Sequence, residues 1–392
     1  MEKYNNLKKK YLINNITNIT SINNDSWNSC AGTSNPFVSY EFLETLEESN
    51  CISEKTGWIP YHLTVNDKEN NLVACCPLYV KTHSQGEYVF DHSWANALEQ
   101  AGGNYYPKLL VAIPFTPVSG PRLLVKSKNH SKFIKNIMIE RIIEIAKQNN
   151  FSSLHLNFTQ NIDNNILLNK NFLSRVGIQF HWKNNDYKDF NDFLFFLSSR
   201  KRKSILKERE KALKEKIKIY TFTGKNITCE HLESFYKFYI DTTSKKWGIP
   251  YLNKKFFNLL NEKINNKIVL IMAKRQDEWV AGAMNLLGED TLYGRYWGCL
   301  EEHKFLHFEI CYYQAIDFAI KNKITNVQAG AQGPHKLSRG YLPEKTYSWH
   351  WLNNSSLNEA VKKFLIEEKK SIDQTIDYFK NLSPYKNNEN IT

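Results

Sequence analysis

Two titratable side chains lie in the first turn of a predicted helix in the second half of the chain. Residues 307–322 have the apolar spacing of an amphipathic helix, and His307 and Glu309 stand at its start. The helix dipole favours ionised Glu309 and neutral His307. A neutral imidazole accepts a proton from an attacking amine, and an ionised carboxylate orients an ammonium group. The pair therefore predicts catalysis at an amine; the alternative is a packing histidine beside a helix-stabilising glutamate.

A turn-rich segment follows the next predicted strand, at residues 330–341. Its sequence, GAQGPHKLSRGY, combines three glycines and a proline with four polar candidates, namely Gln332, His335, Lys336 and Arg339. If a helical turn forms here, Lys336 and Arg339 lie on one side of it. Exposed backbone N–H groups beside two cations bind phosphates and other anions. We therefore expect an anion-binding loop at the protein surface rather than a plain connection.

The predicted strand at residues 292–299 carries a cation between aromatic side chains. Strand alternation places Tyr293, Arg295 and Trp297 on one face, and Leu292, Gly294, Tyr296 and Gly298 on the other. Two glycines within a strand mark a bulge or a close approach of a ligand to the backbone. Arg295 and Tyr296 are therefore candidate contacts for a carboxylate or phosphate. An edge-strand cation–π pair is the alternative for Arg295.

Further candidate ligand contacts are aromatic and basic residues elsewhere in the chain. They are Tyr106, Lys108 and Arg122 in the first half, Arg202 in a basic run, and Trp247 at the end of a predicted helix. Aromatic residues, prolines and cations of this kind line clefts, but they also form ordinary aromatic cores with proline-rich turns and solvated charge runs. Both interpretations stay open for these five positions.

The elements that must position these residues occur twice in the same order. Each half predicts a strand, two helices, several antiparallel strands, a helix, a strand, a helix or loop (near Ile162 in the first half) and a final strand. Residues 189–216 are predicted to form one long linking helix with a basic end, and residues 355–382 a lysine-rich helix packed along the second domain. We therefore predict an N-terminal domain at 1–188, the linking helix, and a C-terminal domain at 217–392 with the main site.

Composition narrows the class of protein. With 392 residues, 42% of them hydrophobic, the chain is long and apolar enough to fold around a core. Its 52 Lys and Arg residues against 40 Asp and Glu give a net charge of +12, which favours anionic partners such as phosphates, nucleic acid or acidic lipid. The sequence lacks glycines at the spacing of nucleophile elbows, Walker loops or dinucleotide fingerprints. This argues against covalent hydrolases and NTPases.

The distribution of prolines and cysteines bears on compartment and metal binding. Pro114, Pro117 and Pro121 interrupt the longest apolar stretch, and the first residues lack an apolar signal core. We therefore expect neither a membrane span nor a secretory signal. The seven cysteines are scattered without zinc-type spacing, so we predict no metal site. An odd, scattered set of cysteines is typical of a reducing compartment, which predicts a cytoplasmic protein.

Four blocks of the sequence resemble the FemAB-like family, described as peptidoglycan biosynthesis/recognition proteins and predicted N-acyltransferases. The blocks are SWANALEQAGGNYYPKLLVAIPFTPVSGPRLL (93–124), SSRKRKSILKERE (198–210), LYGRYWGCLEEHKFLHFEICYYQAIDFAI (292–320) and GAQGPHKLSRGY (330–341). The resemblance covers nearly the whole chain. It implies an α+β fold class with two tandem GNAT-like acyltransferase folds, whose mixed, mostly antiparallel sheets are flanked by helices. This agrees with the repeated order of elements.

The same resemblance implies an N-acyltransferase related to Fem-type ligases, which join an aminoacyl group from tRNA to the amine of a peptidoglycan precursor. The chain departs from these ligases because no long coiled-coil hairpin is evident between its halves. It departs from CoA-dependent GNAT enzymes because LEEHKF, at residues 300–305, replaces their glycine-rich pyrophosphate loop. Neither departure selects one donor over the other. The expected acyl donor is acyl-CoA or aminoacyl-tRNA, used as a co-substrate, with no bound cofactor.

We expect an amine of a small molecule or precursor to attack the acyl carbon directly, without a covalent enzyme intermediate. His307 is predicted to assist deprotonation and Glu309 to orient the amine, while Arg295, Lys336 and Arg339 hold an anionic group. The predicted partners are the amine acceptor, tRNA and a peripheral membrane surface. The competing hypothesis is a noncatalytic binder of an anionic ligand, either nucleic acid or a peptidoglycan precursor, on the same fold.

Overall fold

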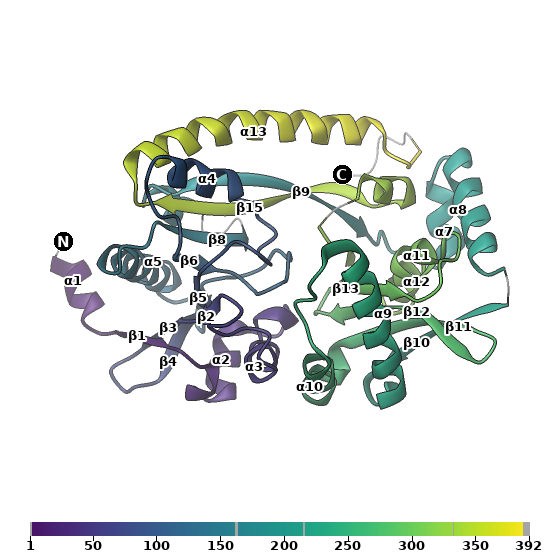
Figure 1. Ribbon diagram of the computed structural model, residues 1–392, viewed down its shortest axis with the longest axis horizontal. Coiled ribbons are helices and arrows are strands. Elements are labelled where there is room, and N and C mark those ends of the chain that lie inside the picture. The colour runs from purple at the N-terminus through teal and green to yellow at the C-terminus, as the bar shows by residue number, and fades with distance from the viewer. Residues whose placement is uncertain (1, 161–163, 215, 332, 387–392) are drawn as a thin grey trace. The chain divides into compact units, whose positions relative to one another are not determined.

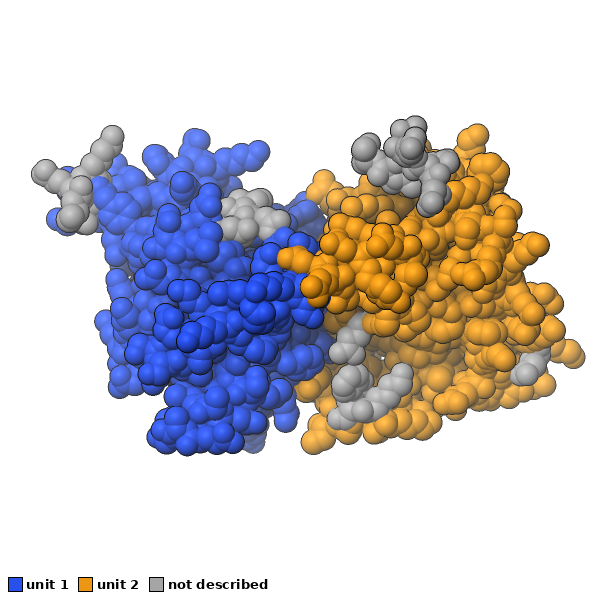
Figure 2. Space-filling view, turned by 90° about the horizontal axis from the view of Figure 1, so that it is seen from above, with its two compact units in different colours: residues 1–177, 345–372 blue, residues 178–344, 373–392 orange. Residues whose placement is uncertain are grey.

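The computed structural model describes residues 2–160, 164–214, 216–331 and 333–386. The chain forms two compact units, which appear as ribbons in Figure 1 and in two colours in Figure 2. Unit 1 comprises Met1–Gly177 and Lys345–Ile372, and unit 2 comprises Ile178–Glu344 and Asp373–Thr392. The chain therefore passes from one unit to the other three times.

Unit 1 contains two groups of strands. One is a sheet in the order β1 (Leu12–Ile16), β3 (His62–Asn66), β4 (Leu72–Cys76) and β7 (Leu124–Val125). The other has the order β15 (Leu342–Leu352), β8 (Ser153–Thr159), β6 (Lys108–Val111), β5 (Leu78–Lys81) and β2 (Trp58–Pro60). In the second group β6 and β8 run parallel, whereas β15 pairs antiparallel with β8 and β5 pairs antiparallel with both β6 and β2.

Helices flank these strands. They are α1 (Glu2–Lys8), α2 (Asn24–Ala31), α3 (Tyr40–Glu48), α4 (His92–Gln100), α5 (Ser131–Gln148), α6 (Asn164–Leu168) and the first part of α13 (Ser355–Asn381). The apolar residues Ile134, Met138, Ile142 and Ile145 recur three or four positions apart along α5 and are buried in the core with β8. This periodicity explains why residues Ser131–Gln148 form an amphipathic helix. The predicted helix position at Ile162 lies outside the described residues.

Unit 2 is built on one mixed sheet. Its strand order is β10 (Ile217–Thr223), β11 (Ile268–Arg275), β12 (Glu278–Leu287), β13 (Thr291–Cys299), β14 (Asn326–Gln328) and β9 (Leu173–Lys183). Its helices are α7 (Phe190–Phe196), α8 (Ser199–Ala212), α9 (Cys229–Trp247), α10 (Lys254–Ile264), α11 (Leu306–Phe308), a π-helical turn (Glu309–Tyr313) and α12 (Gln314–Lys321). The sheet is antiparallel apart from β13 and β14, which run parallel.

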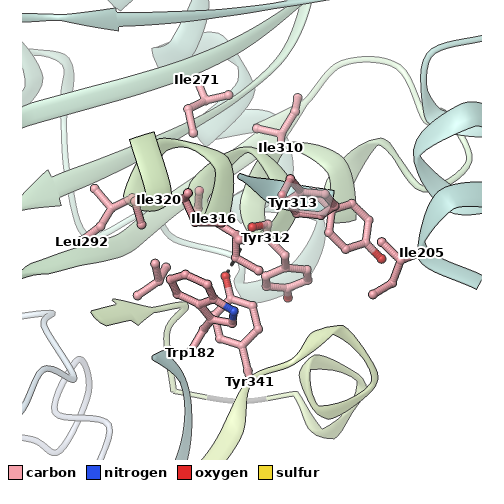
Figure 3. Packing of buried hydrophobic residues seen from close by; sticks show 14 of the residues in the cluster. Trp182, Ile205, Ile271, Leu292, Ile310, Tyr312, Tyr313, Ile316, Ile320 and Tyr341 are labelled. Atoms are coloured by element: carbon pink, nitrogen blue, oxygen red, sulfur yellow. Dashed lines mark hydrogen bonds between the residues drawn. The ribbon is translucent and has the colours of Figure 1, made fainter. Parts of the chain in front are cut away.

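An aromatic core fills the space beneath the helical segment α11–α12. Figure 3 shows Tyr312 and Tyr313 of the π-helical turn beside Tyr341 and Trp182, with Ile316 of α12 nearby. All five side chains are buried. The hydroxyl of Tyr341 donates a hydrogen bond of 3.4 Å to the carbonyl oxygen of Tyr312. This packing fixes the helical segment on the sheet.

The observed strands and helices confirm the predicted α+β class with two GNAT-like folds. Both units have a parallel strand pair, β6 with β8 and β13 with β14, followed by an antiparallel strand. That last strand comes from the other half of the sequence in each case: Trp182 of β9 pairs with Val327 of unit 2, and Trp349 of β15 pairs with Leu156 of unit 1. The units therefore differ from the predicted domains at 1–188 and 217–392, because pairing between distant strands leaves no local pattern.

The predicted single linking helix over residues 189–216 is wrong. Two helices, α7 and α8, are separated at Leu197 and Ser198, whose backbones are extended. Leu197 forms a β-bridge with Tyr385, and the Ser198 N–H donates to the carbonyl oxygen of Pro384 at 2.9 Å. A pairing partner from the C-terminal end of the chain thus interrupts the helix, although the local sequence favours continuation.

The predicted C-terminal helix is confirmed as α13, but only its last part, where Phe379 packs against the core of unit 2, lies along the second unit as predicted. Its first part, through Ile372, belongs to unit 1. There Leu357, Val361 and Leu365 pack in a cluster with Trp94 and Leu98 of α4. The apolar residues recur every four positions, and that pattern shows which face is buried without showing which partner covers it.

None of the described helices combines the length and apolar character needed to span a membrane.

Candidate functional site

Strand β13 contains a bulge at the predicted cation. Asn285 pairs with Gly294 and Met284 pairs with Tyr296, so Arg295 is the extra residue. The predicted alternation is therefore wrong beyond Gly294. Tyr296 packs against Tyr239 and Phe257 of α9 and α10, whereas Trp297 packs with Leu292 in the core beneath α12. The guanidinium carbon of Arg295 lies 5.4 Å from the centre of the Tyr296 ring.

The two glycines of β13 have different explanations. Gly294 stands next to the bulge, and a Cβ atom placed there would lie 3.3 Å from the carbonyl oxygen of Gln328. At Gly298 a Cβ atom would lie 2.1 Å from the carbonyl oxygen of Phe238, so the helix α9 approaches this strand closely. The predicted bulge is thus observed, and the close approach at Gly298 is made by the protein itself.

Strands β13 and β14 separate beside this bulge. Their parallel pairing comprises Thr291 with Asn326, Leu292 with Val327 and Tyr293 with Gln328. Within the described part of the chain, the pairing ends there while β13 continues to Cys299. Backbone N–H groups of a strand that has lost its neighbour on one side are donors for a ligand. Past Tyr293, the N–H group of Cys299 donates to Thr242 Oγ1 at 3.1 Å, and the described pairing with β14 does not extend into this part of β13.

His307 lies beside this part of β13. Its half-buried ring is centred 5.0 Å from the Trp297 ring and 5.4 Å from that of Tyr312. The helical segment begins at Leu306, so His307 is in the first turn as predicted. The π-helical turn that follows is a feature often found at functional sites.

The side chain of Glu309 is buried within unit 2. Its side chain is 0% exposed. Arg209 of α8 holds it with two hydrogen bonds of 3.2 and 2.9 Å, and Gln314 donates a third of 2.7 Å. Burial raises the pKa of Glu309, while Arg209 opposes that shift. The predicted lowering of its pKa is therefore wrong, because the carboxyl group is desolvated inside unit 2. Both carboxylate oxygens are engaged by the protein, which does not match the expected amine-orienting role.

The two cations predicted to form an exposed anion-binding loop are buried. Residues Pro334–Arg339 form a 3₁₀ helix, in which Lys336 is 2% exposed and Arg339 is 6% exposed. Lys336 Nζ donates to the carbonyl oxygen of Gly330 at 2.9 Å, and burial lowers the pKa of this lysine to about 8. Arg339 pairs with Glu208 at 2.9 Å and lies 3.5 Å above the Phe308 ring. The predicted surface location is therefore wrong, because both cations find internal partners.

His335 is the exposed polar side chain of this segment. Its Nε2 atom lies 2.9 Å from the hydroxyl oxygen of Tyr312. The side chain as a whole is exposed, but desolvation of the ring where it packs beside Phe308 and Tyr312, together with the positive charges of Arg339 and Lys336, lowers the pKa of His335. The His335 ring centre is 6.4 Å from that of His307. An imidazole with a lowered pKa is neutral at neutral pH, as a general base must be.

A groove of about 590 Å³ opens at His335. Its lining is mainly apolar and comprises Ile178 and Phe180 of β9, Phe379 of α13, and Ala331, Gly333, Pro334 and His335. The groove thus adjoins the loop that starts where β13 and β14 separate. A groove with apolar walls and one basic nitrogen is suited to a reaction that requires partial exclusion of water.

The structure brings His307 and His335 together, with ring centres 6.4 Å apart. Tyr296, with Arg295 beside its ring, packs instead against α9 and α10. Arg202 is half-buried on α8, and no contact of its guanidinium group with the others is described. Gln332 and the side chain of Trp247 lie outside the described residues. Lys336, Arg339 and Glu309 are buried and bind other protein groups, through the contacts given above.

Arg122 in unit 1 is structural. It is 1% exposed, and it donates to the carbonyl oxygens of Asn157 at 2.9 Å and Val118 at 2.6 Å. A guanidinium group that satisfies backbone acceptors in a core stabilises loops. These contacts favour the packing alternative for Arg122.

Lys108 lies at the centre of a buried charged cluster in unit 1. Its ammonium group contacts Glu87 at 2.9 Å, Asp91 at 2.5 Å and Ser84 at 2.8 Å, and the half-buried Tyr106 donates to or accepts from Ser84 at 2.8 Å. Lys108 itself is 0% exposed. The lysine is thus enclosed by protein partners, which does not match the predicted cleft wall.

A second buried lysine is expected to make the stability of unit 1 depend on pH. Lys81 is 0% exposed and lies 3.8 Å above the Trp58 ring. Burial lowers its pKa from 10.5 to about 7, and burial raises the pKa of Glu87 from 4.5 to about 7. Between pH 7 and 10.5 the unfolded chain holds a proton on Lys81 that the folded chain lacks. Stability is therefore expected to rise with pH in that range.

Replacing Lys81 by methionine is expected to abolish this rise. Methionine keeps the apolar stem but has no group that titrates. The contribution of position 81 to the free energy of unfolding therefore becomes independent of pH between about 7 and 10, the range in which Lys81 is protonated only in the unfolded chain. Urea unfolding of both proteins at several pH values measures the effect. An unchanged slope in the variant would show that other groups cause the dependence. The exposed Lys126 provides a matched control as Lys126→Met.

Sequence reasoning missed the residues that hold the predicted ones. Tyr312 bonds His335, Arg209 bonds Glu309, and Glu208 pairs with Arg339. The available signal is the spacing of Ile205, Glu208, Arg209 and Ala212 along α8, which puts them on one helix face. The many charged residues of this segment make the buried face of α8 difficult to recognise from the sequence.

The comparisons with known proteins agree with this fold. The family model of FemAB-like proteins, described as peptidoglycan biosynthesis/recognition, matches residues 18–387. No curated protein sequence gives a significant match. Among solved structures, FemX is 11% identical with a TM-score of 0.54, covering 90% of this chain and 100% of FemX. L-PGS from Bacillus licheniformis is 10% identical with a TM-score of 0.51, covering 86% of this chain and 97% of L-PGS.

A conserved protein of unknown function from Bacteroides thetaiotaomicron is also similar, at 10% identity and a TM-score of 0.50, covering 86% of this chain and 99% of that protein. At these identities the structural likeness concerns the fold alone. The family match, by contrast, extends over both compact units and all four sequence blocks that carry the resemblance. The chain therefore belongs to the FemAB-like family of peptidoglycan biosynthesis/recognition proteins.

Proposed function

We propose that this protein is an N-acyltransferase that transfers an acyl or aminoacyl group to an amine of a peptidoglycan precursor. One observation carries the proposal: the pairing of β13 with β14 ends at Tyr293, and the loop that follows β14 lines a groove together with the exposed base His335. Acyl transfer to an amine requires donors for the developing oxyanion and an acceptor for the amine proton. We assign the first role to backbone N–H groups of β13 past the end of its pairing with β14, and the second role to His335. The family description supports a peptidoglycan precursor as the acceptor.

The reaction proceeds by direct attack. The acceptor amine forms a bond to the acyl carbon, and the carbonyl oxygen becomes an oxyanion that β13 backbone N–H groups stabilise. The amine proton passes to the imidazole of His335, either directly or through one water molecule. Collapse of the intermediate then breaks the bond to the donor's leaving group, which receives the proton. The products are the amide and the free leaving group.

His335, rather than His307, is the base in this proposal. His335 lines the groove, whereas His307 is half-buried against Trp297 and Phe308. If His335 Nε2–H donates to the Tyr312 oxygen, the Nδ1 atom carries the lone pair that accepts the proton. Burial raises the pKa of the Tyr312 hydroxyl well above its usual value, so this hydroxyl stays protonated and keeps the imidazole in place.

The test is a transfer assay with defined donors and acceptors. The full chain is incubated with labelled aminoacyl-tRNA or with acyl-CoA, together with a peptidoglycan precursor that carries a free amine. Mass spectrometry of the precursor then detects the added group. Product with one donor supports the transferase and identifies that donor. Tight binding of the precursor without product from either donor supports the noncatalytic binder instead.

Blocking the groove provides a prediction within this proposal. Ala331→Trp is expected to lower kcat/KM for transfer by about tenfold or more, because an indole ring occupies the space that a substrate needs. The melting temperature should stay within about 2 °C, since Ala331 is at the groove surface. Ala97→Trp, on an exposed face of α4, is the matched control. Equal activity of the two variants would place the reaction outside this groove.

A further inference from the structure

The surface formed by α7 and α8, which we call the α7–α8 surface, combines exposed apolar side chains with cations. Its apolar members are Phe195, Phe196, Leu206 and Leu213, and its cations are Arg200, Lys203, Lys207 and Lys214, all of them exposed. Phe195 is 60% exposed and Leu206 is 48% exposed. Both helices belong to unit 2, where Figure 1 shows them in teal.

The two faces of α8 differ sharply. The inner face carries Ile205 and Ala212, both 1% exposed, and Arg209, whose charge is paired with Glu309. Lys203 and Lys207 lie on the opposite face, four residues apart. Their charges therefore point to solvent and are not needed for the fold. Between Lys207 and Lys214, the exposed acidic residue on this face is Glu210.

Phe195 lies at the end of α7, close in sequence to the first turn of α8. The ammonium group of Lys386 lies 3.8 Å above its ring, which adds a cation next to the aromatic side chain. Exposed apolar side chains that gather on one surface mark an interaction site. They are typical of surfaces that enter the interface of a membrane, where the rings reach the acyl chains and the lysines meet anionic head groups.

We propose that the α7–α8 surface docks on an anionic lipid bilayer. Charge complementarity favours this partner, since the chain carries a net charge of +12 and Arg200, Lys203 and Lys207 are clustered here. The exposed apolar residues favour lipid over a nucleic-acid duplex, because phosphate contacts alone do not use phenylalanine or leucine. The surface would hold the protein at the membrane face, and this docking does not depend on acyl transfer.

The experiment is co-sedimentation of the full chain with two kinds of vesicle. One is phosphatidylcholine, and the other contains about 30% phosphatidylglycerol, which gives the negative surface potential that attracts lysines. Binding is expected to the anionic vesicles and to fall steeply with salt. Equal binding to both kinds, or binding to neither, overturns the proposal.

Variants locate the binding surface. Lys203→Ala combined with Lys207→Ala is expected to weaken binding to anionic vesicles by about 25-fold, roughly fivefold for each lysine. The matched control replaces two exposed lysines of unit 1, Lys362→Ala with Lys363→Ala, and should change binding less than about twofold, because those lysines lie outside the proposed surface. An equal loss in both double variants would indicate a general charge effect and overturn the assignment.

The apolar contact is tested separately. Phe195→Ser is expected to weaken binding about tenfold, because the ring no longer leaves water. In Phe195→Trp, the new indole should be quenched by brominated lipids more strongly than the tryptophans of the native protein. Absence of additional quenching contradicts insertion. If tRNA instead binds in a way that needs Lys203 and Lys207 but not Phe195, while vesicles do not compete with it, the surface is a nucleic-acid site and the proposal is wrong.

Discussion

Replacing His335 by alanine is expected to lower the turnover rate of acyl transfer by about 10²- to 10⁴-fold, the usual contribution of a positioned general base. The reason is the location of the imidazole: it lines the groove, and Tyr312 holds its Nε2 atom at 2.9 Å. Binding of the acceptor should change little, because the proton is transferred only during the reaction. The measurement is kcat and KM for wild type and His335→Ala with the donor identified in the transfer assay.

Three comparisons make this result specific. His307→Ala should cost less than about tenfold, because the ring packs against Trp297 and does not line the groove. Tyr312→Phe should show a smaller loss than His335→Ala and shift the pH profile, since it removes only the bond that orients the base. His92→Ala, an exposed histidine of unit 1, is the control. A large loss in His307→Ala with normal activity in His335→Ala would return the role of base to His307.

Replacing Arg209 by alanine is expected to destabilise unit 2 by about 3 to 5 kcal/mol, the cost of leaving one partner of a buried ion pair alone. Arg209 makes two hydrogen bonds to Glu309, which is 0% exposed, and one of 2.7 Å to Asp317. It also lies 4.2 Å above the ring of Phe190 on α7. Its removal therefore deletes an ionic contact between α8 and the helical segment of the site, together with the contact to Phe190 of α7. Urea unfolding followed by circular dichroism measures the loss.

Two further variants distinguish charge from packing. Glu309→Gln removes the buried charge but keeps the size and the acceptor oxygen, so it should cost much less than Arg209→Ala. Lys207→Ala removes an exposed cation from the same helix and should stay within about 0.5 kcal/mol of wild type. A loss below about 1 kcal/mol in Arg209→Ala would show that the pair behaves like an exposed surface ion pair.

Local patterns were sufficient for most elements of the fold. The apolar spacing of residues 131–148 and 92–100 predicts α5 and α4 with their observed bounds. The repeated order of elements predicted two similar folds, which the parallel pairs in both units confirm. These features depend on contacts between residues close in sequence, so the sequence reports them directly.

The predictions fail where distant parts of the chain meet. The break at Leu197 depends on Tyr385, and the burial of Arg339 depends on Glu208. The sequence of residues 330–341 does not show that Arg339 pairs with Glu208 inside the protein. It therefore predicts a surface loop. The π-helical turn likewise follows from tertiary packing.

The candidate site shows the same division. His335 and Arg295 were recognisable from residue type and spacing, and the glycines of β13 correctly marked a bulge. The bulge puts Trp297 on the same face of β13 as Leu292, whereas strict alternation predicts opposite faces. Its position depends on the pairing register with Asn285. A shift of one residue changes every later side chain of a strand to the other face. Alternation alone therefore cannot assign the face of a strand that contains glycine.

The exchange of β9 and β15 has a consequence for how the chain acquires its structure during synthesis. β8, at Ser153–Thr159, obtains its partner β15 only after residue 352 has left the ribosome, so one edge of that strand is without a neighbour while the whole second half is being made. An unpaired edge is a template for wrong pairing with other chains. The first half of this protein therefore remains incomplete as a folded body until the last strand arrives, and a gene cut between the halves would encode two fragments that each lack a strand.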